Sequence, residues 1–327
     1  MQQSWIRVFG AACALISCLI SPATATSISS KWSRSRTRAS APRHSDPFLL
    51  HARNTTTNST AGFAQRNFNT ISSIYGLTVY PNQVPIIVNG GAAVPPGLFS
   101  QDVVGRVDPV GDFIGFEASI EYFFALAPIP QPSDRFAAIT SYKITEFSSG
   151  CPGVASSVVY LYCSVVNPGA PDDGTPLPPL KQVAFWTFDA SGAVLKYDAW
   201  IPRLNAWLEQ TAGGVSVTDP QFQAGTIAAL CDATQQRCLG PDNVQWNSTA
   251  QCVAALAQKP FGNYDEARGD NVVCRAIHVI LTVGNPDTHC PHVGPTGGGA
   301  CIDVPYGHVF EDEDVYSDPI GETFVCK

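Results

Sequence analysis

The sequence predicts an α+β domain followed by a disulfide-rich C-terminal module of loops and helices. Residues 115–127 carry apolar side chains at helical spacing, and residues 138–201 contain several runs rich in β-branched and aromatic residues. Seven of the 11 cysteines follow residue 230. A helix followed by consecutive strands is typical of an α+β domain, and clustered cysteines indicate a cross-linked module.

Residues 1–25 have the pattern of a secretory signal peptide. Arg7 is the only charged residue among the first 30, an apolar run extends from Val8 to Ile20, and Ala23-Thr24-Ala25 provides small residues for cleavage. The apolar run is shorter than a membrane-spanning helix needs, and the C-terminus lacks the apolar tail of a lipid-anchor signal. We therefore expect a secreted, extracellular protein with no membrane anchor.

Residues 26–62 are expected to form a disordered, basic, glycosylated arm. Residues 26–60 contain six basic residues and one acidic residue. Sequons for N-glycosylation occur at Asn54 and Asn58, and a third occurs at Asn247. Residues 61–327 carry 12 basic and 26 acidic residues, which argues against a nucleic-acid partner because phosphate binding needs a basic face.

Two folded units are expected after the arm. The α+β domain spans residues 63–210, and a Cys/His-rich module spans residues 225–327. Between them, Thr211-Ala212-Gly213-Gly214 is a hinge or turn sequence.

The elements of the first unit follow from local patterns. A helix is expected from about Gly115 to Ala127, where Pro128 ends it. Strands are expected at 138–147 and 156–166. A hairpin pairs 183–188 with 193–201 through the turn Asp189-Ala190-Ser191-Gly192, and a helix over 202–210 closes the unit.

Two stretches carry a resemblance to a known superfamily. The run Phe185–Asp198 (FWTFDASGAVLKYD) resembles the last hairpin of nuclear-transport-factor-two-like, or SnoaL-like polyketide-cyclase, domains, and Gly115–Phe124 (GFEASIEYFF) is similar to the helix before their sheet. The whole chain also resembles uncharacterised secreted fungal proteins that carry the run His289–Gly299 (HCPHVGPTGGG). The resemblance implies a cone: a curved antiparallel sheet wrapped on helices around an apolar pocket for a small ligand. It also implies a homodimer that pairs through the sheet.

Enzymes of that superfamily often place an Asp–His pair or tyrosine hydroxyls in the pocket. This sequence departs from the pattern because no histidine lies between His51 and His278. Acid–base catalysis near neutral pH would then need another group. The candidates, each with an alternative role in the core or on the surface, are Asp102, Glu117, Tyr122, Tyr160 and Asp198, together with Asp108, Glu121 and Trp186. For Glu121 the alternative is a place on an exposed helix face.

The C-terminal module contains a candidate site for a divalent metal ion. Asp270-Asn271 can cap a helix that carries Cys274 and His278 on one face. His289 and His292, with His278 or His308 and with Asp287 or Asp303, would supply imidazoles and a carboxylate. The spacing matches no standard zinc pattern, since Pro291 is expected to interrupt any helix that carries His289 and His292.

The competing interpretation of this module is structural. Nine cysteines remain after signal cleavage, so four disulfides leave one thiol. Cys163 lies in an apolar strand and is the expected free cysteine. The cysteines expected to pair are Cys151, Cys231, Cys238, Cys252, Cys274, Cys290, Cys301 and Cys326. Their connectivity stays open at the level of sequence.

Three functions agree with these features. The first is a secreted protein that binds a small apolar ligand or partner in the cone. The second is an extracellular enzyme, either of the cone-based isomerase, cyclase or dehydratase type or metal-assisted through the C-terminal histidines. The third is a structural or host-interaction factor. The metal-assisted enzyme requires His278, His289, His292 or His308 to meet one another or the mouth of the cone.

Overall fold

The computed structural model describes residues 60–130, 136–211, 214–305, 307, 315–319 and 321–327. The expected signal peptide, most of the basic arm, the sequons at Asn54 and Asn58, and His308 therefore lie outside the described residues. The first described helix begins at Thr60, three residues before the expected start of the α+β domain at residue 63.

The first unit is built on a six-stranded sheet. Its helical elements are α2 (Thr60–Thr78), α3 (Val84–Asn89), the 3₁₀ turn η1 (Gly90–Ala93), α4 (Phe116–Ile120), the π-helical turn η2 (Glu121–Ala125) and α5 (Leu204–Thr211). Its strands are β1 (Phe99–Asp108), β2 (Gly111–Ile114), β3 (Phe136–Cys151), β4 (Val154–Val166), β5 (Leu180–Phe188) and β6 (Val194–Trp200). The strand order is β2-β1-β6-β5-β4-β3. The helix, the strand pair and the hairpin expected after residue 115 are thus all present.

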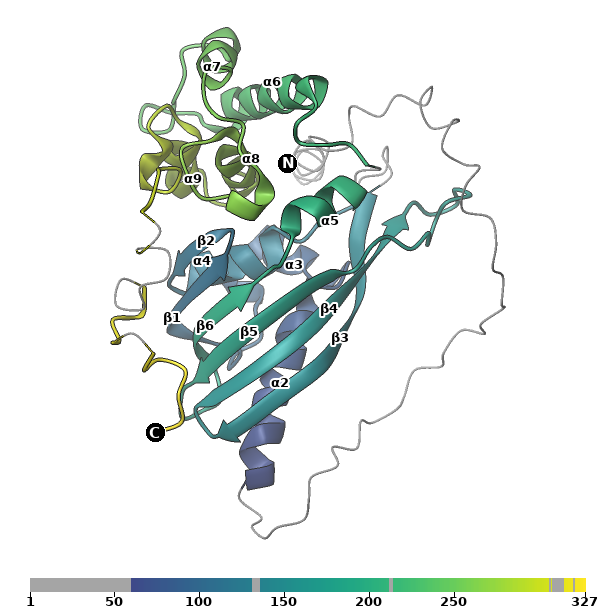
Figure 1. Ribbon diagram of the computed structural model, residues 1–327, viewed down its shortest axis with the longest axis vertical. Coiled ribbons are helices and arrows are strands. Elements are labelled where there is room, and N and C mark those ends of the chain that lie inside the picture. Colours follow the sequence, from purple (N-terminus) through teal and green to yellow (C-terminus); the bar gives the residue numbers. More distant parts are fainter. Residues whose placement is uncertain (1–59, 131–135, 212–213, 306, 308–314, 320) are drawn as a thin grey trace.

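The sheet is curved, and α2 crosses behind it in Figure 1. Neighbouring strands are antiparallel except β1 and β6, which pair in parallel. This parallel pair joins the early strand β1 to the last strand of the meander. The result is the α+β cone that the resemblance implied, with one parallel pair that the sequence patterns did not indicate.

Aromatic side chains fill the described interior of the cone between η2 and the sheet. The Phe123 ring lies 6.0 Å from the Trp186 ring and 5.2 Å from the Tyr197 ring, measured between centroids. Tyr197 fits because the facing strand carries Gly105, where a Cβ atom would lie 1.8 Å from the Tyr197 ring. Burial of such rings is a main source of stability, since each removes a large apolar area from water.

The second unit is a helical module. Its elements are α6 (Pro220–Arg237), α7 (Thr249–Leu256), the 3₁₀ turn η3 (Tyr264–Glu266), α8 (Val272–Leu281), α9 (Pro286–Val293) and the 3₁₀ turn η4 (Gly297–Gly299). In Figure 1 these helices gather at one end of the sheet, above α4 and β2. None of the helices in the described ranges is long and apolar enough to cross a bilayer.

Helix α8 connects the cores of the two units. Val273 belongs to the core of the cone and Ile277 packs against it, whereas Val272, Ala276 and Val279 belong to a separate core within the helical module. One helix therefore buries apolar side chains on two sides, which fixes the module against the cone.

Four disulfides join the eight cysteines that were expected to pair. Within the module they link Cys231 to Cys252, Cys238 to Cys290, and Cys274 to Cys301. The fourth links Cys151, at the end of β3, to Cys326. Cys163 is free and buried.

The C-terminal strap, residues 315–319 and 321–327, lies on the face of the sheet opposite α2. It is attached by the Cys151–Cys326 disulfide and by an ion pair of 2.6 Å between Lys196 and Asp318. The Tyr316 hydroxyl donates a hydrogen bond of 2.7 Å to the backbone carbonyl of Tyr197. The strap therefore covers part of the outer surface of β5 and β6.

Candidate three-histidine site between the two units

Three histidine side chains meet at the junction of the cone and the helical module. His278 comes from α8, and His289 and His292 come from α9. The Nδ1 atom of His278 lies 3.1 Å from that of His289 and 3.2 Å from that of His292. The candidate ligand atoms of all three lie within 4.8 Å of one another.

Local sequence explains how α9 presents two of these rings. The Asn285 side chain caps the helix by accepting a hydrogen bond from the Thr288 backbone N–H, and Pro286 occupies the first turn. The expectation that Pro291 interrupts the helix is wrong, because α9 continues through it to Val293. The helix is short, so Pro291 removes only one internal hydrogen bond near its end. Residues three apart then share a face, which brings His289 and His292 together.

The cone contributes Glu121 to the cluster. Its Oε2 atom lies 3.0 Å from Nε2 of His289, and its side chain is 17% exposed. Glu121 is thus half-buried between the units rather than on an exposed helix face, which corrects that expectation. Because a carboxylate accepts a hydrogen bond, Nε2 of His289 carries the proton and Nδ1 presents its lone pair to the other two rings.

Burial keeps the other two imidazoles neutral. It lowers the pKa of His278 well below the ordinary value, and the neighbouring His292, His289 and Arg275 lower it further. Burial, with a contribution from His289, lowers the pKa of His292 to about 4, against a smaller opposing effect of Glu121. Neutral imidazole is the form that binds metal ions.

Hydrogen bonds alone do not account for both short distances to Nδ1 of His278, whereas a bound cation would account for both. If Nδ1 of His278 donates its one proton to His289, that proton is not available to His292. Two imidazole nitrogens bound to one tetrahedral zinc ion lie about 3.3 Å apart, given Zn–N distances of about 2.0–2.1 Å. The distances of 3.1 and 3.2 Å are close to that value. The spacing of these nitrogen atoms is therefore suited to a divalent metal ion.

The three histidines differ in burial. His289 is buried, with 6% of its surface exposed, but His278 and His292 are only half-buried. Three protein ligands with an accessible further position are typical of catalytic metal sites, whereas structural zinc sites have four protein ligands.

The other residues expected to bind metal lie elsewhere or have other partners. Asp287 accepts a hydrogen bond of 2.7 Å from the Asn243 side chain, and Asp303 accepts one of 3.0 Å from the backbone N–H of Asp270. The sulfurs of Cys274 and Cys301 lie near His278, but they are joined in a disulfide and are not thiolate ligands. His308 lies outside the described residues.

The residues expected to be catalytic do not converge. Asp102 on β1 and Glu117 on α4 are exposed, and Tyr160 is half-buried on β4. Tyr122 is buried in the cone, where its hydroxyl accepts a hydrogen bond from Gln182. Asp198 is buried in an ion pair with Arg106.

The three additional residues also have defined surroundings. Trp186 is buried and donates a hydrogen bond to Ser157, while Asp108 is half-buried at the end of β1. Partial burial raises the pKa of Asp108. Of all these candidates, Glu121 is the one that the structure places against the histidines.

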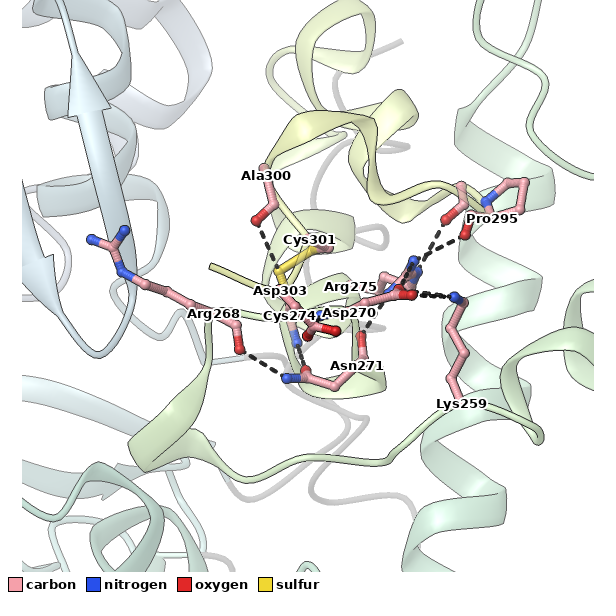
Figure 2. Close-up of polar contacts among 11 residues, drawn as sticks. Lys259, Arg268, Asp270, Asn271, Cys274, Arg275, Pro295, Ala300, Cys301 and Asp303 are labelled. Atoms are coloured by element: carbon pink, nitrogen blue, oxygen red, sulfur yellow. Dashed lines mark hydrogen bonds and ion pairs between the residues drawn. A yellow bond between two sulfur atoms is a disulfide. The ribbon is translucent and has the colours of Figure 1, made fainter. Parts of the chain in front are cut away.

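A buried arginine holds the loop after α9 against α8 (Figure 2). Arg275 has no exposed surface. Its guanidinium donates to the backbone carbonyls of Gly294, Asn271 and Pro295, and to the carboxylate of Asp270 at 2.7 Å. These bonds fix α8 relative to the end of α9, and with it the rings that both helices carry.

Acidification is expected to weaken this brace. Partial burial raises the pKa of Asp270, but hydrogen bonds from Lys259 and Arg275 outweigh that effect and hold the pKa below its usual value. Its stabilising contribution is therefore complete above about pH 4 and is lost as the pH falls through the folded-state pKa. Urea unfolding of wild type and Asp270→Asn from pH 7 to pH 2 measures this. The stability difference should be present at pH 7 and shrink below pH 4, and a difference independent of pH would contradict the assignment.

Comparison with known proteins assigns most of the chain to one family. The family model for the BfoA N-terminal domain matches residues 73–199, and the model for the BfoA family C-terminal domain matches residues 197–304. The chain is 31% identical over 228 residues to the aurasperone B biosynthesis cluster protein A of Aspergillus niger, covering 67% of this chain and 72% of that protein. It is 29% identical over 228 residues to the bifonsecin B biosynthesis cluster protein A of Aspergillus brasiliensis, covering 67% and 74%.

Solved structures similar to this chain include two that each cover less than half of it. One is a protein named as a SnoaL-like polyketide cyclase from Jannaschia sp. CCS1, with 10% identity, a TM-score of 0.32, and coverage of 49% of this chain and 98% of that one. Another is a steroid delta-isomerase from Pseudomonas aeruginosa, with 12% identity, a TM-score of 0.27, and coverage of 45% and 89%. The two family models and the relative in Aspergillus niger together show that the chain belongs to the BfoA family.

Proposed function

We propose that this protein is a metal-dependent enzyme that acts on a small molecule at the three-histidine site. The observation that carries the proposal is the approach of two Nδ1 atoms to that of His278, the one of His289 at 3.1 Å and the one of His292 at 3.2 Å. The names of the relatives place those proteins in biosynthesis clusters for aurasperone B and bifonsecin B. A small-molecule substrate for this chain agrees with those names.

The chemistry of the site favours a Lewis-acid role for the metal ion. Three neutral imidazoles leave the charge of a divalent ion uncompensated, so the ion attracts and polarises an oxygen atom of a substrate or a water molecule. His278 and His292 are half-buried whereas His289 is buried, so that oxygen would approach on the side of His278 and His292. Glu121 contacts His289 on the side of the ring away from Nδ1, so it supports a ligand and is not itself a fourth ligand.

Ligand binding inside the cone is the alternative proposal. The aromatic rings of Phe123, Trp186 and Tyr197 occupy the described interior beside η2, so the proposed chemistry lies at the junction of the two units instead. A small apolar ligand retained by the purified protein would favour the alternative.

A single preparation tests both proposals. The protein is secreted from a eukaryotic host, purified without metal-affinity resin, trimmed of glycans, and weighed by native and denaturing mass spectrometry. We expect the wild type to carry one divalent ion and His289→Ala/His292→Ala to carry none. A metal-free wild type that also fails to take up added Zn²⁺ would reject the metal-dependent enzyme, and a retained organic mass would support the ligand-binding cone.

Turnover is tested on natural mixtures because the substrate is unidentified. Culture extract from a strain lacking the gene is incubated with Zn²⁺-loaded wild type or with His278→Ala, and products are compared by liquid chromatography and mass spectrometry. We expect compounds to change with the wild type alone. Identical product profiles, with Zn²⁺ bound to the wild type, would reject the enzymatic role and leave a metal-binding protein.

We also infer that the protein is exported. Four disulfides support this, because disulfides persist in oxidising compartments. Asn247 is exposed just before the cap of α7, where a glycan can be accommodated. Protein recovered from culture medium should begin at Thr26 and lose mass on treatment with peptide N-glycosidase. Retention inside the cell with no glycan would contradict export.

A further inference from the structure

We infer that the metal centre acts as a clasp between the two units, and that Glu121 is the residue through which the cone contributes to it. This inference rests on the proposed metal centre. It adds that cation binding by the helical module and docking of that module on the cone are thermodynamically coupled.

The two residues of this contact, Glu121 and His289, come from different units. Glu121 lies in the cone and His289 lies in the module, 168 residues further along the chain. The three histidines all belong to the module, on α8 and α9. The contact between Glu121 and His289 is therefore where the module's cation site meets the cone. Helix α8 also packs against η2, the turn that begins at Glu121.

The turn η2, which begins at Glu121, is π-helical. The Leu126 backbone N–H bonds to the Glu121 carbonyl at 3.2 Å, a spacing of five residues rather than four. Such π-helical turns are rare and occur frequently at functional sites, because the wider turn changes the direction of the side chains around it. Here the turn buries Tyr122, Phe123 and Phe124 in the cone, while Glu121 reaches the module. One short turn thus anchors in the core of the cone and contacts a proposed ligand of the cation.

The contact with Glu121 determines the tautomer and orientation of the His289 ring. The Glu121 carboxylate accepts the Nε2 proton of His289, which selects the tautomer with its lone pair on Nδ1 and fixes the ring's orientation. A cation on Nδ1 makes the Nε2–H a stronger donor and so strengthens the bond to Glu121. Linkage requires the reverse as well: a docked cone raises the affinity of the module for the cation. Glu121 is a positioning residue in this scheme.

Titration with Zn²⁺ tests the coupling. The affinity of metal-free protein is measured by competition with a chromophoric chelator for wild type, Glu121→Ala, Glu121→Gln and Glu117→Ala. Glu117 is exposed on the preceding turn and lies outside the cluster, so its replacement is a control for the same change in charge. We expect Glu121→Ala to raise the Kd about 10–100-fold, Glu121→Gln to recover part of the loss because the amide oxygen still accepts a hydrogen bond, and Glu117→Ala to have little effect.

Hydrogen exchange provides a measurement that a purely structural role would not affect. In the wild type, Zn²⁺ should slow exchange of backbone amides in α8 and α9 and also in residues 116–126 of the cone. In Glu121→Ala, protection should be confined to α8 and α9. Equal Zn²⁺ affinity of wild type and Glu121→Ala, or protection in the wild type restricted to the module, would overturn the clasp while leaving the metal centre intact. A wild type that binds no Zn²⁺ would reject both.

Discussion

Replacing His278 with alanine is expected to weaken Zn²⁺ binding more than any other single change at the site. Its Nδ1 atom is the one that contacts both other rings, at 3.1 and 3.2 Å. Structural zinc sites with four ligands gain about 10–16 kcal/mol on binding, so one ligand contributes on the order of 3–4 kcal/mol, or roughly a 300-fold change in Kd. The measurement is chelator competition on metal-free protein, with unfolding curves to confirm that the variant is folded.

Two further variants are compared with His278→Ala. Ile280→Ala changes a half-buried side chain on the same helix and should leave the Kd unchanged. His308→Ala addresses the fourth histidine expected from the sequence, which the described residues do not include. A His278→Ala protein that binds Zn²⁺ as tightly as the wild type would show that the three rings do not bind a shared ion.

Breaking the buried ion pair between Arg106 and Asp198 should cause the largest loss of stability from a single substitution. The two side chains are 5% and 6% exposed, they face each other across the parallel pair β1–β6, and the guanidinium lies 5.5 Å from the centre of the Tyr316 ring. Asp198→Asn removes the negative charge and leaves the arginine charge buried. Losing one partner of a buried pair typically costs about 3–5 kcal/mol. Denaturant unfolding of the metal-free protein measures the change.

The double variant Arg106→Met/Asp198→Leu separates charge from packing. It removes both charges and retains apolar volume, so it should be more stable than Asp198→Asn alone. Zn²⁺ affinity should be the same in the folded variants, since this pair lies outside the histidine cluster. If Asp198→Asn lowers the free energy of unfolding by less than about 1 kcal/mol, the pair is not needed to balance the arginine charge. A large change in Zn²⁺ affinity would indicate that Asp198 contributes to the functional site.

The parts of the fold that the sequence predicted are those determined by local patterns. The helix at Gly115, the hairpin around Asp189–Gly192 and the capped helix at Asn271 each depend on neighbouring residues, and each is present. The parallel pairing of β1 with β6 depends on residues about 90 positions apart, such as Arg106 and Asp198. A single sequence shows no periodicity that would reveal such a pairing, so β1 and β2 were not expected.

The site shows the same division between local and distant information. His289 and His292, with His278 or His308, were candidate metal ligands because imidazoles concentrate in one short stretch. The sequence did not assign Glu121 to this site, because the neighbouring residues fit an amphipathic helix with Glu121 on its exposed face. Its partner His289 lies 168 residues away. Pro291 misled the prediction for a different reason: general rules exclude proline from helix interiors, but an eight-residue helix also tied to Cys238 through Cys290 tolerates it.

The disulfide that attaches the strap sets a constraint on biosynthesis. Cys151 and Cys326 are 175 residues apart, and Cys326 is the penultimate residue of the sequence. At about 5–20 residues per second, the ribosome needs roughly 10–35 s to make the intervening chain. During that interval Cys151 cannot form its final disulfide, whereas Cys163, 12 residues further along the chain, and then the six cysteines of the helical module become available as other partners. Correct pairing in this protein therefore requires that any disulfide formed earlier by Cys151 be broken before Cys151 joins Cys326.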